Sequence, residues 1–468
     1  MLSRRALLRN AAALAAASAC PARAEAPLRV LKLQRKTIEV AGRPASVYAI
    51  AGADGEEGFT ANVGGRFRVR VENALDEPSL VHWHGLAPPW RQDGVPEISG
   101  PAIPPGGAAD YDFPLGFGGT YYMHSHYGLQ EQLLFAAPLI VKDPRRFAQR
   151  QEIVVMLADF SFASPQEIYA GLVATGSRHG ASRMKMRMGK EAAARKTAAP
   201  DLNDVAYDAF LANERTIDAP DVIPVEAGGR ILLRLVNSAS MSNFRVDLGA
   251  LDGSLVAVDG QDVVPVTGRS FPIAVAQRLD ILVDLPKGAR AFPICFVLEG
   301  ERRQAAVILS APGAPIEKLP QAAAEPAAAL DLALESQLRA ASPLAARKAD
   351  RTIPIDLTGD MARYVWSIDN RVWNDRTPPY DVKAGERVEL ALTNKTMMSH
   401  PMHLHGHRFQ VIEIDGTRFA GALRDTVLVP PGKRVVIAFD ADNPGRWAFH
   451  CHLLYHAQAG MFASLRYV

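Results

Sequence analysis

The residues best suited to redox chemistry stand together near the C-terminus of the chain. His450, Cys451 and His452 are consecutive, and His456 and Met461 follow closely. A cysteine thiolate, imidazoles and a weak methionine thioether form the ligand set of a blue, electron-transferring copper site. Successive side chains of a strand point to opposite faces, so an extended segment would direct Cys451 away from its two neighbouring histidines. The segment therefore predicts metal on both faces of one strand, connected through Cys451.

Histidines elsewhere in the chain repeat this pattern. Ten of the 12 histidines fall into four clusters, which argues against a chance arrangement. Besides the C-terminal segment, the clusters are His82-Trp83-His84, His124-Ser125-His126 and His400-Pro401-Met402-His403-Leu404-His405. Residues i and i+2 of a strand share a face, so each pair would direct both rings towards neighbouring metal ions. Each ring also needs a partner for its second nitrogen, and the sequence does not identify these partners.

In order and spacing, the four clusters resemble the motifs of the multicopper oxidases. The resemblance implies that a type 1 copper is bound by His400, Cys451, His456 and Met461. It implies a type 2 copper bound by His82 and His403, and two type 3 coppers bound by the sets His84, His124, His452 and His126, His405, His450. In this family the type 1 copper takes single electrons from a donor, and the three-copper cluster reduces O2 to two waters. We therefore expect four coppers per chain, with Cys451 as the junction between the two sites.

Proton delivery to oxygen requires acids near the three-copper cluster. Asp93 stands at the position where the family has such an acid, next to the type 2 copper. A solvated aspartate in an Asp93-Gly94 turn is the alternative interpretation. Many family members carry a second acid after the third histidine of the last motif, where this chain has Ala457 and Gln458. The sequence therefore leaves a second proton route unassigned.

Residues that flank the clusters narrow the resemblance to bacterial periplasmic copper-resistance oxidases. They include the segments 394–400 and 128–132, and Asp425. We therefore expect the enzyme to oxidise Cu(I), and phenols or aromatic amines as well, with O2 as acceptor. A laccase with an organic donor and a copper-binding cupredoxin protein without catalysis are the alternatives. All eight histidines of the three-copper cluster are present, which favours an enzyme, and a nitrite reductase would use fewer domains and fewer ligands per chain.

Five methionines could contact Cu(I), because thioethers are soft ligands. Met184, Met186 and Met188 alternate with Lys185 and Arg187, which would place the three sulfurs on one side of an extended loop. The positive charge of this loop repels a cation, so a loop or a flap over the core is the alternative. Met397 and Met398 precede His400, and either Cu(I) contact or core packing would explain them.

An internal repeat divides the chain into three similar units. The strand-like segment 65–73 recurs at 229–237 and 385–394, each time starting with Gly and ending with Asn. A second repeat relates 119–126 to 445–452, so the outer units would each supply two His-x-His strands to one interface, with the middle unit as a spacer. Alternating runs between Gly and Pro turns predict an all-β fold of three cupredoxin-like Greek-key β-sandwich domains. We expect domains at 25–145, 146–315 and 351–468, with a linker at 316–350 and a short helix within 327–341.

The N-terminal residues resemble a twin-arginine export signal. Ser3-Arg4-Arg5 precedes an alanine-rich apolar run, and Ala22-Arg23-Ala24 fits a cleavage site. An amphipathic helix is the alternative. Without residues 1–24, which hold four arginines and no acid, the count changes from 52 basic and 50 acidic residues to 48 and 50. We therefore expect a periplasmic, nearly neutral monomer that binds no nucleic acid and has no membrane span.

Overall fold

The computed structural model describes residues 27–175 and 202–468. Its N-terminal strands form two four-stranded sheets, in the orders β2-β1-β4-β6 and β3-β8-β7-β5. Their bounds are β1 (Arg29–Val40), β2 (Arg43–Gly52), β3 (Phe59–Asn62), β4 (Arg66–Asn73), β5 (Val81–His84), β6 (Ala108–Pro114), β7 (Gly119–Ser125) and β8 (Ala136–Lys142), with 3-10 helices η1 (Trp90–Gln92) and η2 (Gln130–Leu133).

The strands between residues 151 and 310 form a second pair of sheets, in the orders β10-β9-β12-β17-β14-β15 and β11-β19-β18-β13-β16. Helix α2 (Pro165–Thr175) follows the first strand of this pair. The strands are β9 (Gln151–Phe160), β10 (Ala209–Ala212), β11 (Asp221–Pro224), β12 (Arg230–Asn237), β13 (Phe244–Asp247), β14 (Gly253–Val258), β15 (Gln261–Gly268), β16 (Ser270–Ile273), β17 (Arg278–Asp284), β18 (Ala291–Leu298) and β19 (Gln304–Ser310).

A third pair of sheets follows residue 350, in the orders β21-β20-β23-β29-β25-β26, with β27 beside β25, and β22-β31-β30-β24-β28. Between the second and third pairs, the chain forms helix α4 (Ala333–Gln337), inside the range where a short helix is predicted. The remaining elements are β20 (Arg351–Asp360), β21 (Val365–Ile368), β22 (Tyr380–Val382), β23 (Arg387–Asn394), β24 (His400–Leu404), β25 (Phe409–Ile414), β26 (Thr417–Arg418), β27 (Leu423–Arg424), β28 (Thr426–Val429), β29 (Arg434–Asp440), β30 (Arg446–Cys451), α5 (Leu454–Gln458) and β31 (Phe462–Tyr467).

The repeated segment occupies the same place in all three sheet pairs. Strands β4, β12 and β23 each pair in parallel with the first strand of their unit, which is β1, β9 or β20. On the other side, each pairs antiparallel with β6, β17 or β29. The predicted all-β class with three two-sheet domains is therefore confirmed.

The asparagine that ends each repeat fixes the loop that follows. Asn394 donates its amide to the carbonyls of Met398 and Val429 and accepts from the Thr396 backbone N–H. Asn73 and Asn237 make the same three kinds of hydrogen bond in their own units. A buried amide with all its groups bonded specifies one loop conformation, because any other would leave polar groups without partners. In the first and third units, this loop leads to a histidine-bearing strand.

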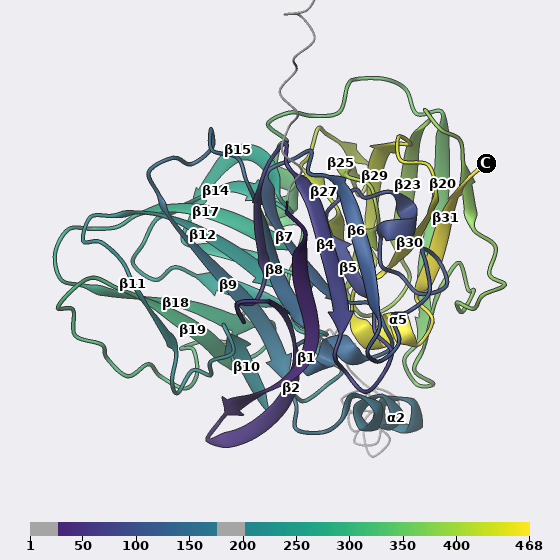
Figure 1. The fold of residues 1–468 in the computed structure, drawn as a ribbon. Helices are drawn as coiled ribbons and strands as arrows, with labels where there is room; N and C mark the ends of the chain where they lie inside the picture. Colours follow the sequence, from purple (N-terminus) through teal and green to yellow (C-terminus); the bar gives the residue numbers. More distant parts are fainter. Residues whose placement is uncertain (1–26, 176–201) are drawn as a thin grey trace, which may run out of the picture.

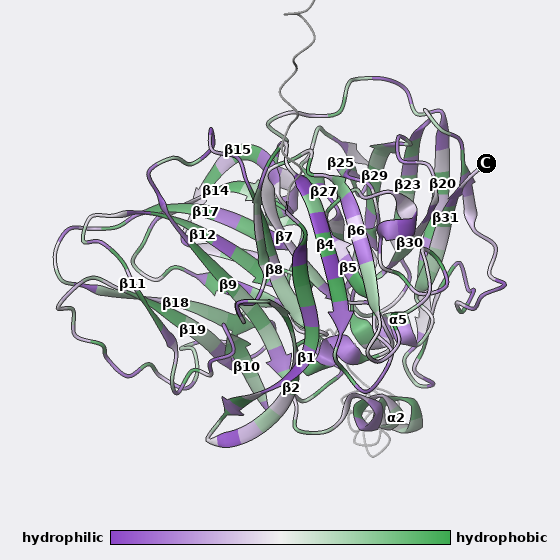
Figure 2. Ribbon diagram, in the orientation of Figure 1, coloured by the Kyte–Doolittle hydropathy of each residue, from purple (hydrophilic) through white to green (hydrophobic). Residues whose placement is uncertain are grey.

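Burial follows the alternation of the strands. Strand β4 buries Phe67, Val69 and Val71, and its intervening arginines are partly or fully exposed. Figure 2 shows the resulting change between hydrophobic and hydrophilic residues along this strand. The N-terminal unit has a hydrophobic cluster of its own, whereas a second cluster continues from the middle unit into the C-terminal one. The middle and C-terminal domains therefore share part of their core.

The N-terminal unit lies between the other two in the view of Figure 1, and α2 of the middle unit lies near α5 of the C-terminal unit. The rings of Tyr169 on α2 and Tyr455 on α5 are 6.2 Å apart and nearly parallel. Helices long and apolar enough to cross a membrane do not occur between residues 27 and 175 or after 201.

Candidate metal centre

Four histidine pairs meet where the outer domains face each other. Strand β5 pairs with β7 so that His82 lies opposite His124, and β24 pairs with β30 so that His403 lies opposite His450. The same register in both domains brings the i+2 histidines onto the same side. We call the resulting group the histidine cluster; its members are His82, His84, His124, His126, His403, His405, His450 and His452.

Ring nitrogens converge within this cluster. The Nε2 atoms of His82 and His403 are 3.4 Å apart, although these residues belong to different domains. His450 Nε2 lies 3.0 Å from His405 Nε2 and 3.3 Å from His126 Nε2. His405 and His450 each donate from Nδ1, to Asp93 and to the Cys451 carbonyl, so their Nε2 atoms face each other as lone pairs, which a cation between them would accept.

Backbone carbonyls hold the opposite nitrogen of several rings. Nδ1 of His82 donates to the Asp93 carbonyl and Nδ1 of His403 to the Asp425 carbonyl, both at 2.8 Å. His124 and His450 donate in the same way to the carbonyl of the residue that follows each of them, Ser125 and Cys451. These bonds fix the tautomer with a lone pair on Nε2, the atom that faces the cluster.

His84 is turned the other way. Its Nε2 lies 3.0 Å from Asp425 Oδ1 and 3.1 Å from Thr426 Oγ1, so this nitrogen carries the proton. Its Nδ1 is buried and has no hydrogen-bond partner among residues 27–175 and 202–468, and His124 Nε2 shares this condition. A buried nitrogen without a partner is costly unless a ligand completes it. These two atoms therefore fit a metal ion in the cluster.

Burial favours the neutral form of seven rings of the cluster. It lowers the pKa of His450 to about 4, and neighbouring rings add to the effect elsewhere in the cluster. Burial is also the largest cause of the lowered pKa of the following rings: His84, His124, His126, His403, His405 and His452. A neutral imidazole offers the lone pair that a metal ligand must have.

Two carboxylates lie against the cluster. Asp93 is fully buried; its Oδ2 accepts from His405 Nδ1 at 2.8 Å, and its Oδ1 lies 3.3 Å from His82 Nδ1. The solvated-turn alternative for Asp93 is therefore wrong. Glu131 on η2 is also buried, with Oε2 3.5 Å from His124 Nδ1 and Oε1 3.9 Å from His452 Nδ1. In the sequence, Glu131 stands out only as part of the segment 128–132, which predicts no chemistry for it.

The cysteine face of β30 forms a second group of donors. Cys451 Sγ lies 3.5 Å from His400 Nδ1 and 3.9 Å from His456 Nδ1, and the two Nδ1 atoms are 3.2 Å apart. Met461 is fully buried, and its carbonyl accepts from the Cys451 backbone N–H. One thiol, two imidazoles and a neighbouring methionine are the donor set of a blue copper.

The outer nitrogens of these two imidazoles are held from opposite sides. His400 Nε2 donates to Thr396 Oγ1 at 2.7 Å, and His456 Nε2 donates to Asp204 Oδ2 at 2.9 Å. Both rings thereby direct a lone pair on Nδ1 towards the thiol. Asp204 also accepts from the Tyr364 hydroxyl at 2.8 Å. No sequence signal marks Asp204, because it lies 252 residues from His456 in a segment of irregular composition.

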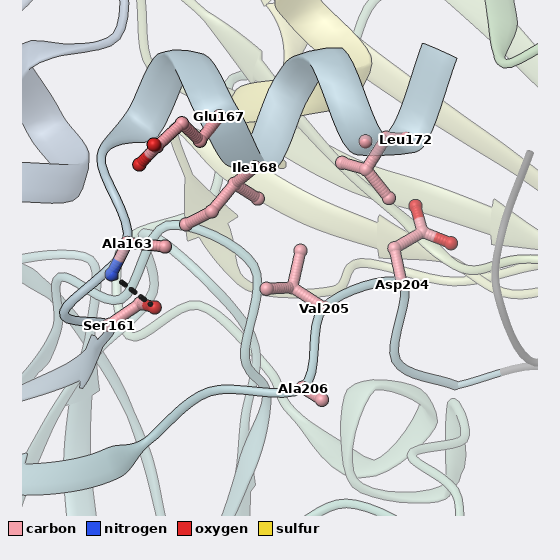
Figure 3. A pocket seen from close by; sticks show the side chains of 9 residues that line it. Ser161, Ala163, Glu167, Ile168, Leu172, Asp204, Val205 and Ala206 are labelled. Atoms are coloured by element: carbon pink, nitrogen blue, oxygen red, sulfur yellow. Dashed lines mark hydrogen bonds between the residues drawn. The ribbon is translucent and has the colours of Figure 1, made fainter. Parts of the chain in front are cut away.

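Asp204 lines a cavity of about 330 Å³. Figure 3 shows helix α2 on one side of this cavity and the segment with Asp204 and Val205 on the other. Ile168 and Leu172 supply an apolar wall, and Glu167 lies at the N-terminal end of the helix. The cavity therefore combines an apolar wall with a carboxylate that contacts His456.

A separate cavity of about 340 Å³ opens beside the histidine cluster. Its lining includes Glu131, His126, Trp373 and Gln458. Gln458 is one of the two residues that replace the expected acid, so at this cavity the carboxyl group comes from Glu131.

The remaining predicted methionines and the two histidines outside the four clusters have different positions. Met398 is buried, whereas Met397 is 56% exposed, so only Met397 presents a side chain to solvent beside the cysteine site. His407 is bonded to the His405 carbonyl through Nδ1 and to the Tyr467 hydroxyl through Nε2, which leaves no nitrogen free for a metal. Met184, Met186, Met188 and His179 lie outside the described residues.

Comparison with known proteins agrees with this geometry. Three family models, each described as multicopper oxidase, match residues 32–146, 181–310 and 347–468. The multicopper oxidase MmcO of Mycobacterium tuberculosis is 34% identical over 87% of this chain and 80% of its own. The copper resistance protein A homolog of Pseudomonas syringae pv. tomato is 28% identical over 85% of each chain.

A solved multicopper oxidase from Pseudomonas thermotolerans superposes with a TM-score of 0.70, at 23% identity, over 94% of this chain and 99% of its own. At this identity the likeness shows the fold, and the three β-sandwiches are cupredoxin-like domains. Copper is accordingly the metal that these donor groups bind. Because family models match three separate segments that cover most of its length, the chain belongs to the multicopper oxidase family and is an oxidoreductase.

Proposed function

We propose that the enzyme holds four coppers and couples one-electron oxidation of Cu(I), and of small phenols, to the reduction of O2 to water. The Cys451 group with His400, His456 and Met461 would hold type 1 copper, and His82 with His403 would hold type 2 copper. The type 3 coppers would be held by the sets His84, His124, His452 and His126, His405, His450.

One observation carries this proposal: most of the predicted ligand rings have one nitrogen bonded to the protein and the other directed at a common centre. This holds for His82, His84, His124, His400, His403, His405, His450 and His456. His452 resembles His84, because its Nε2 lies 3.2 Å from the Tyr122 hydroxyl and its buried Nδ1 has no hydrogen-bond partner among the described residues. Such partners orient ligand rings before the metal binds and raise their affinity for it.

Copper supplies the one-electron steps and the site of O2 reduction, while the protein fixes the geometry and handles protons. The backbone of Cys451 and its neighbours forms the covalent path from the thiol to His450 and His452. Asp93 holds the proton of His405 Nδ1, and its second oxygen is available to pass a proton towards the cluster. Glu131 supplies a second acid beside His124 and His452, where it lines the cavity.

Replacing Glu131 with Gln tests this second proton route. Burial, with a contribution from Asp159, raises the pKa of Glu131 well above its ordinary value and so favours the protonated carboxyl group. Gln keeps the shape and removes the transferable proton, and a general acid contributes about 10²–10⁴-fold to a rate. We expect oxygen uptake at saturating donor to fall by about 10²-fold while copper content stays unchanged. An unchanged uptake rate would show that protons arrive by another path.

The cavity beside His456 suits a small donor with a positive charge or an acidic hydroxyl. Asp204 Oδ1 is buried and has no hydrogen-bond partner in the described part of the chain, while Oδ2 contacts His456. A carboxylate can attract Cu(I) or accept the proton that a phenol loses as it is oxidised. The neighbouring Ile168 and Leu172 suit an aromatic ring. These features support both donors, with the electron entering through the His456 ring.

Replacing Asp204 with Asn tests whether the carboxylate that contacts His456 attracts the donor, or whether the total charge of the cavity does. We expect kcat/KM for Cu(I) to fall by about 10–100-fold, the usual range when a partner of a metal ligand is removed. Glu167→Gln is the matched control, because it removes a negative charge from the same cavity. The carboxylate of Glu167 accepts hydrogen bonds from Ser164 and does not contact His456. Steady-state kinetics with Cu(I) should show a small change for Glu167→Gln. Equal effects of the two substitutions would assign the attraction to net charge.

Oxygen-uptake kinetics of the copper-loaded enzyme test the proposed activity directly. We expect saturable uptake with Cu(I) and with a phenol, at four donor electrons per O2 and without released hydrogen peroxide. Uptake only with the phenol would identify a laccase with an organic donor. Absence of uptake with both donors would favour a copper-binding protein without catalysis. Repeating the Cu(I) series with Met184, Met186 and Met188 replaced, and separately with Met397 replaced, tests the methionines as contacts of the donor.

The predicted localisation of the enzyme depends on the export signal in residues 1–24, which lie outside the described residues. We propose export to the periplasm, where oxidation of Cu(I) would serve copper tolerance, and a monomeric enzyme. The relatives named for copper resistance support this role. Cell fractionation of the native host, with and without substitution of Arg4 and Arg5 by Lys, tests the export signal.

A further inference from the structure

The middle domain contains none of the residues predicted to hold the four coppers, and its sequence predicts a spacer between the outer domains. Its contacts give it a further part. Arg278, the first residue of β17, is fully buried, and its guanidinium bonds both carboxylate oxygens of Asp425 in the C-terminal domain. The Nη1–Oδ1 distance is 2.8 Å. An arginine that meets a carboxylate through two nitrogens fixes the plane of that carboxylate.

Arg278 also joins the N-terminal domain to this pair. Its Nε donates to the Thr120 carbonyl on β7 at 3.3 Å, and its backbone N–H donates to Asp259. Gly85, next to His84, has a φ of +90°, and a Cβ there would lie 2.7 Å from both Arg278 Nη2 and Asp425 Oδ2. The guanidinium therefore lies where the three domains meet, in contact with the backbone beside a cluster histidine.

Asp425 passes this constraint to two histidines. Its Oδ1 accepts from His84 Nε2 at 3.0 Å, which leaves His84 Nδ1 as the free nitrogen. Its backbone carbonyl accepts from His403 Nδ1 at 2.8 Å, which leaves Nε2 facing His82. Asp425 thus holds one histidine of a proposed type 3 site and one of the proposed type 2 site.

The neighbouring Arg424 does not duplicate this function. Its side chain turns to the other side, where Nη1 lies 3.1 Å from Asp259 and Nε 2.8 Å from Glu335 on α4. Arg278 is thus the described side chain that bonds both oxygens of Asp425. A buried carboxylate depends on such a partner, because neither charge is stable there alone.

We propose that Arg278 is a positioning residue of the three-copper cluster, through which the ligand-free middle domain fixes Asp425 and with it the orientation of His84 and His403. This inference rests on the proposed copper assignment. It assigns the middle domain a part in assembling the O2 site, in addition to its part in the fold.

Arg278→Met and Arg278→Lys test this role, with Arg234→Met as matched control. Arg234 is also a buried arginine of the middle domain; it bonds Asp280 at 3.0 Å and Thr120 of the N-terminal domain at 2.8 Å. Its carboxylate partner Asp280 accepts from Thr120 and Arg234, not from a cluster histidine. The control therefore removes the same charge from the middle domain, at its contact with the N-terminal domain, without touching Asp425.

Three readouts separate positioning from stability: copper bound per chain against chelator concentration, the visible band of type 1 copper, and thermal unfolding of the copper-free proteins. For Arg278→Met we expect cluster copper to be bound about 10–100-fold more weakly, with the type 1 band retained. Arg278→Lys should recover part of this affinity, because lysine still supplies a charge but only a single point of contact. Arg234→Met should lower the unfolding temperature without a selective loss of cluster copper.

Wild-type affinity for cluster copper in both Arg278 variants would overturn the inference, and so would an equal selective loss in Arg234→Met. Failure of the proposed function has a different signature. In that case the wild-type enzyme itself would bind no copper in the histidine cluster or would show no oxygen uptake.

Discussion

Replacing Cys451 with Ser should abolish the visible copper band and reduce oxygen uptake with every donor to background. Cys451 is the described thiol that lies within 3.5 Å of His400, and a hydroxyl is a poor ligand for copper in this setting. The Cys451 thiol is not among the predicted ligands of the histidine cluster, so the copper of the cluster should remain bound. Copper analysis should therefore give three ions per chain against the four proposed for the wild-type enzyme, and electron paramagnetic resonance should retain the type 2 signal alone.

Cys295→Ser is the matched control for this experiment. Cys295 is the other described cysteine, half-buried on β18, and it forms no disulfide. Its substitution should leave the visible band and the uptake rate near their wild-type values. If Cys451→Ser kept its oxygen uptake, electrons would enter the histidine cluster without passing Cys451, and the proposed path would be wrong.

Replacing Asp93 with Asn should slow the reaction with O2 by about 10²–10⁴-fold, the contribution expected of a general acid. The backbone carbonyl of residue 93 still accepts from His82, and the Asn oxygen can still accept from His405 Nδ1. The ligand rings should therefore keep their orientation and their copper. What the variant loses is a group that can give up and regain a proton next to the cluster.

Two half-reactions locate this effect. Anaerobic reduction of the enzyme by the donor should proceed at the wild-type rate, whereas reoxidation of the reduced enzyme by O2 should be slow. Asp280→Asn is the control, because Asp280 is an equally buried aspartate whose partners are Thr120 and Arg234. A similar slowing of reoxidation in this control would assign the effect of Asp93→Asn to altered packing.

In the proposed mechanism, Glu131 takes the place of an acid that the sequence lacks after His456. Ala457 and Gln458 stand where an acid was expected, and Gln458 lines the cavity beside the histidine cluster. Glu131 reaches the same cavity from η2 in the first domain. A chemical group can thus be kept while its position in the sequence changes, because the cluster is surrounded by two domains and either can supply a side chain.

The sequence by itself determined the chemistry of the donors and the repeated frame that carries them. Side chains on a strand alternate with a period of two, so His82 and His84 share one face, whereas Cys451 and His450 take opposite faces. This relation is local and needs no knowledge of distant contacts. The asparagine at the end of each repeat is local as well, since Asn394 fixes the loop that begins directly after it.

Only the tertiary structure decided which side chains complete the sites. Asp204 reaches His456 across 252 residues of sequence, and Arg278 reaches Asp425 across 147. Neither residue lies in a pattern with its partner, because these contacts form when separate domains pack against each other. The middle domain illustrates the difference: its sequence lacks ligands, yet the packing of three domains places its arginine against the carboxylate that orients His84.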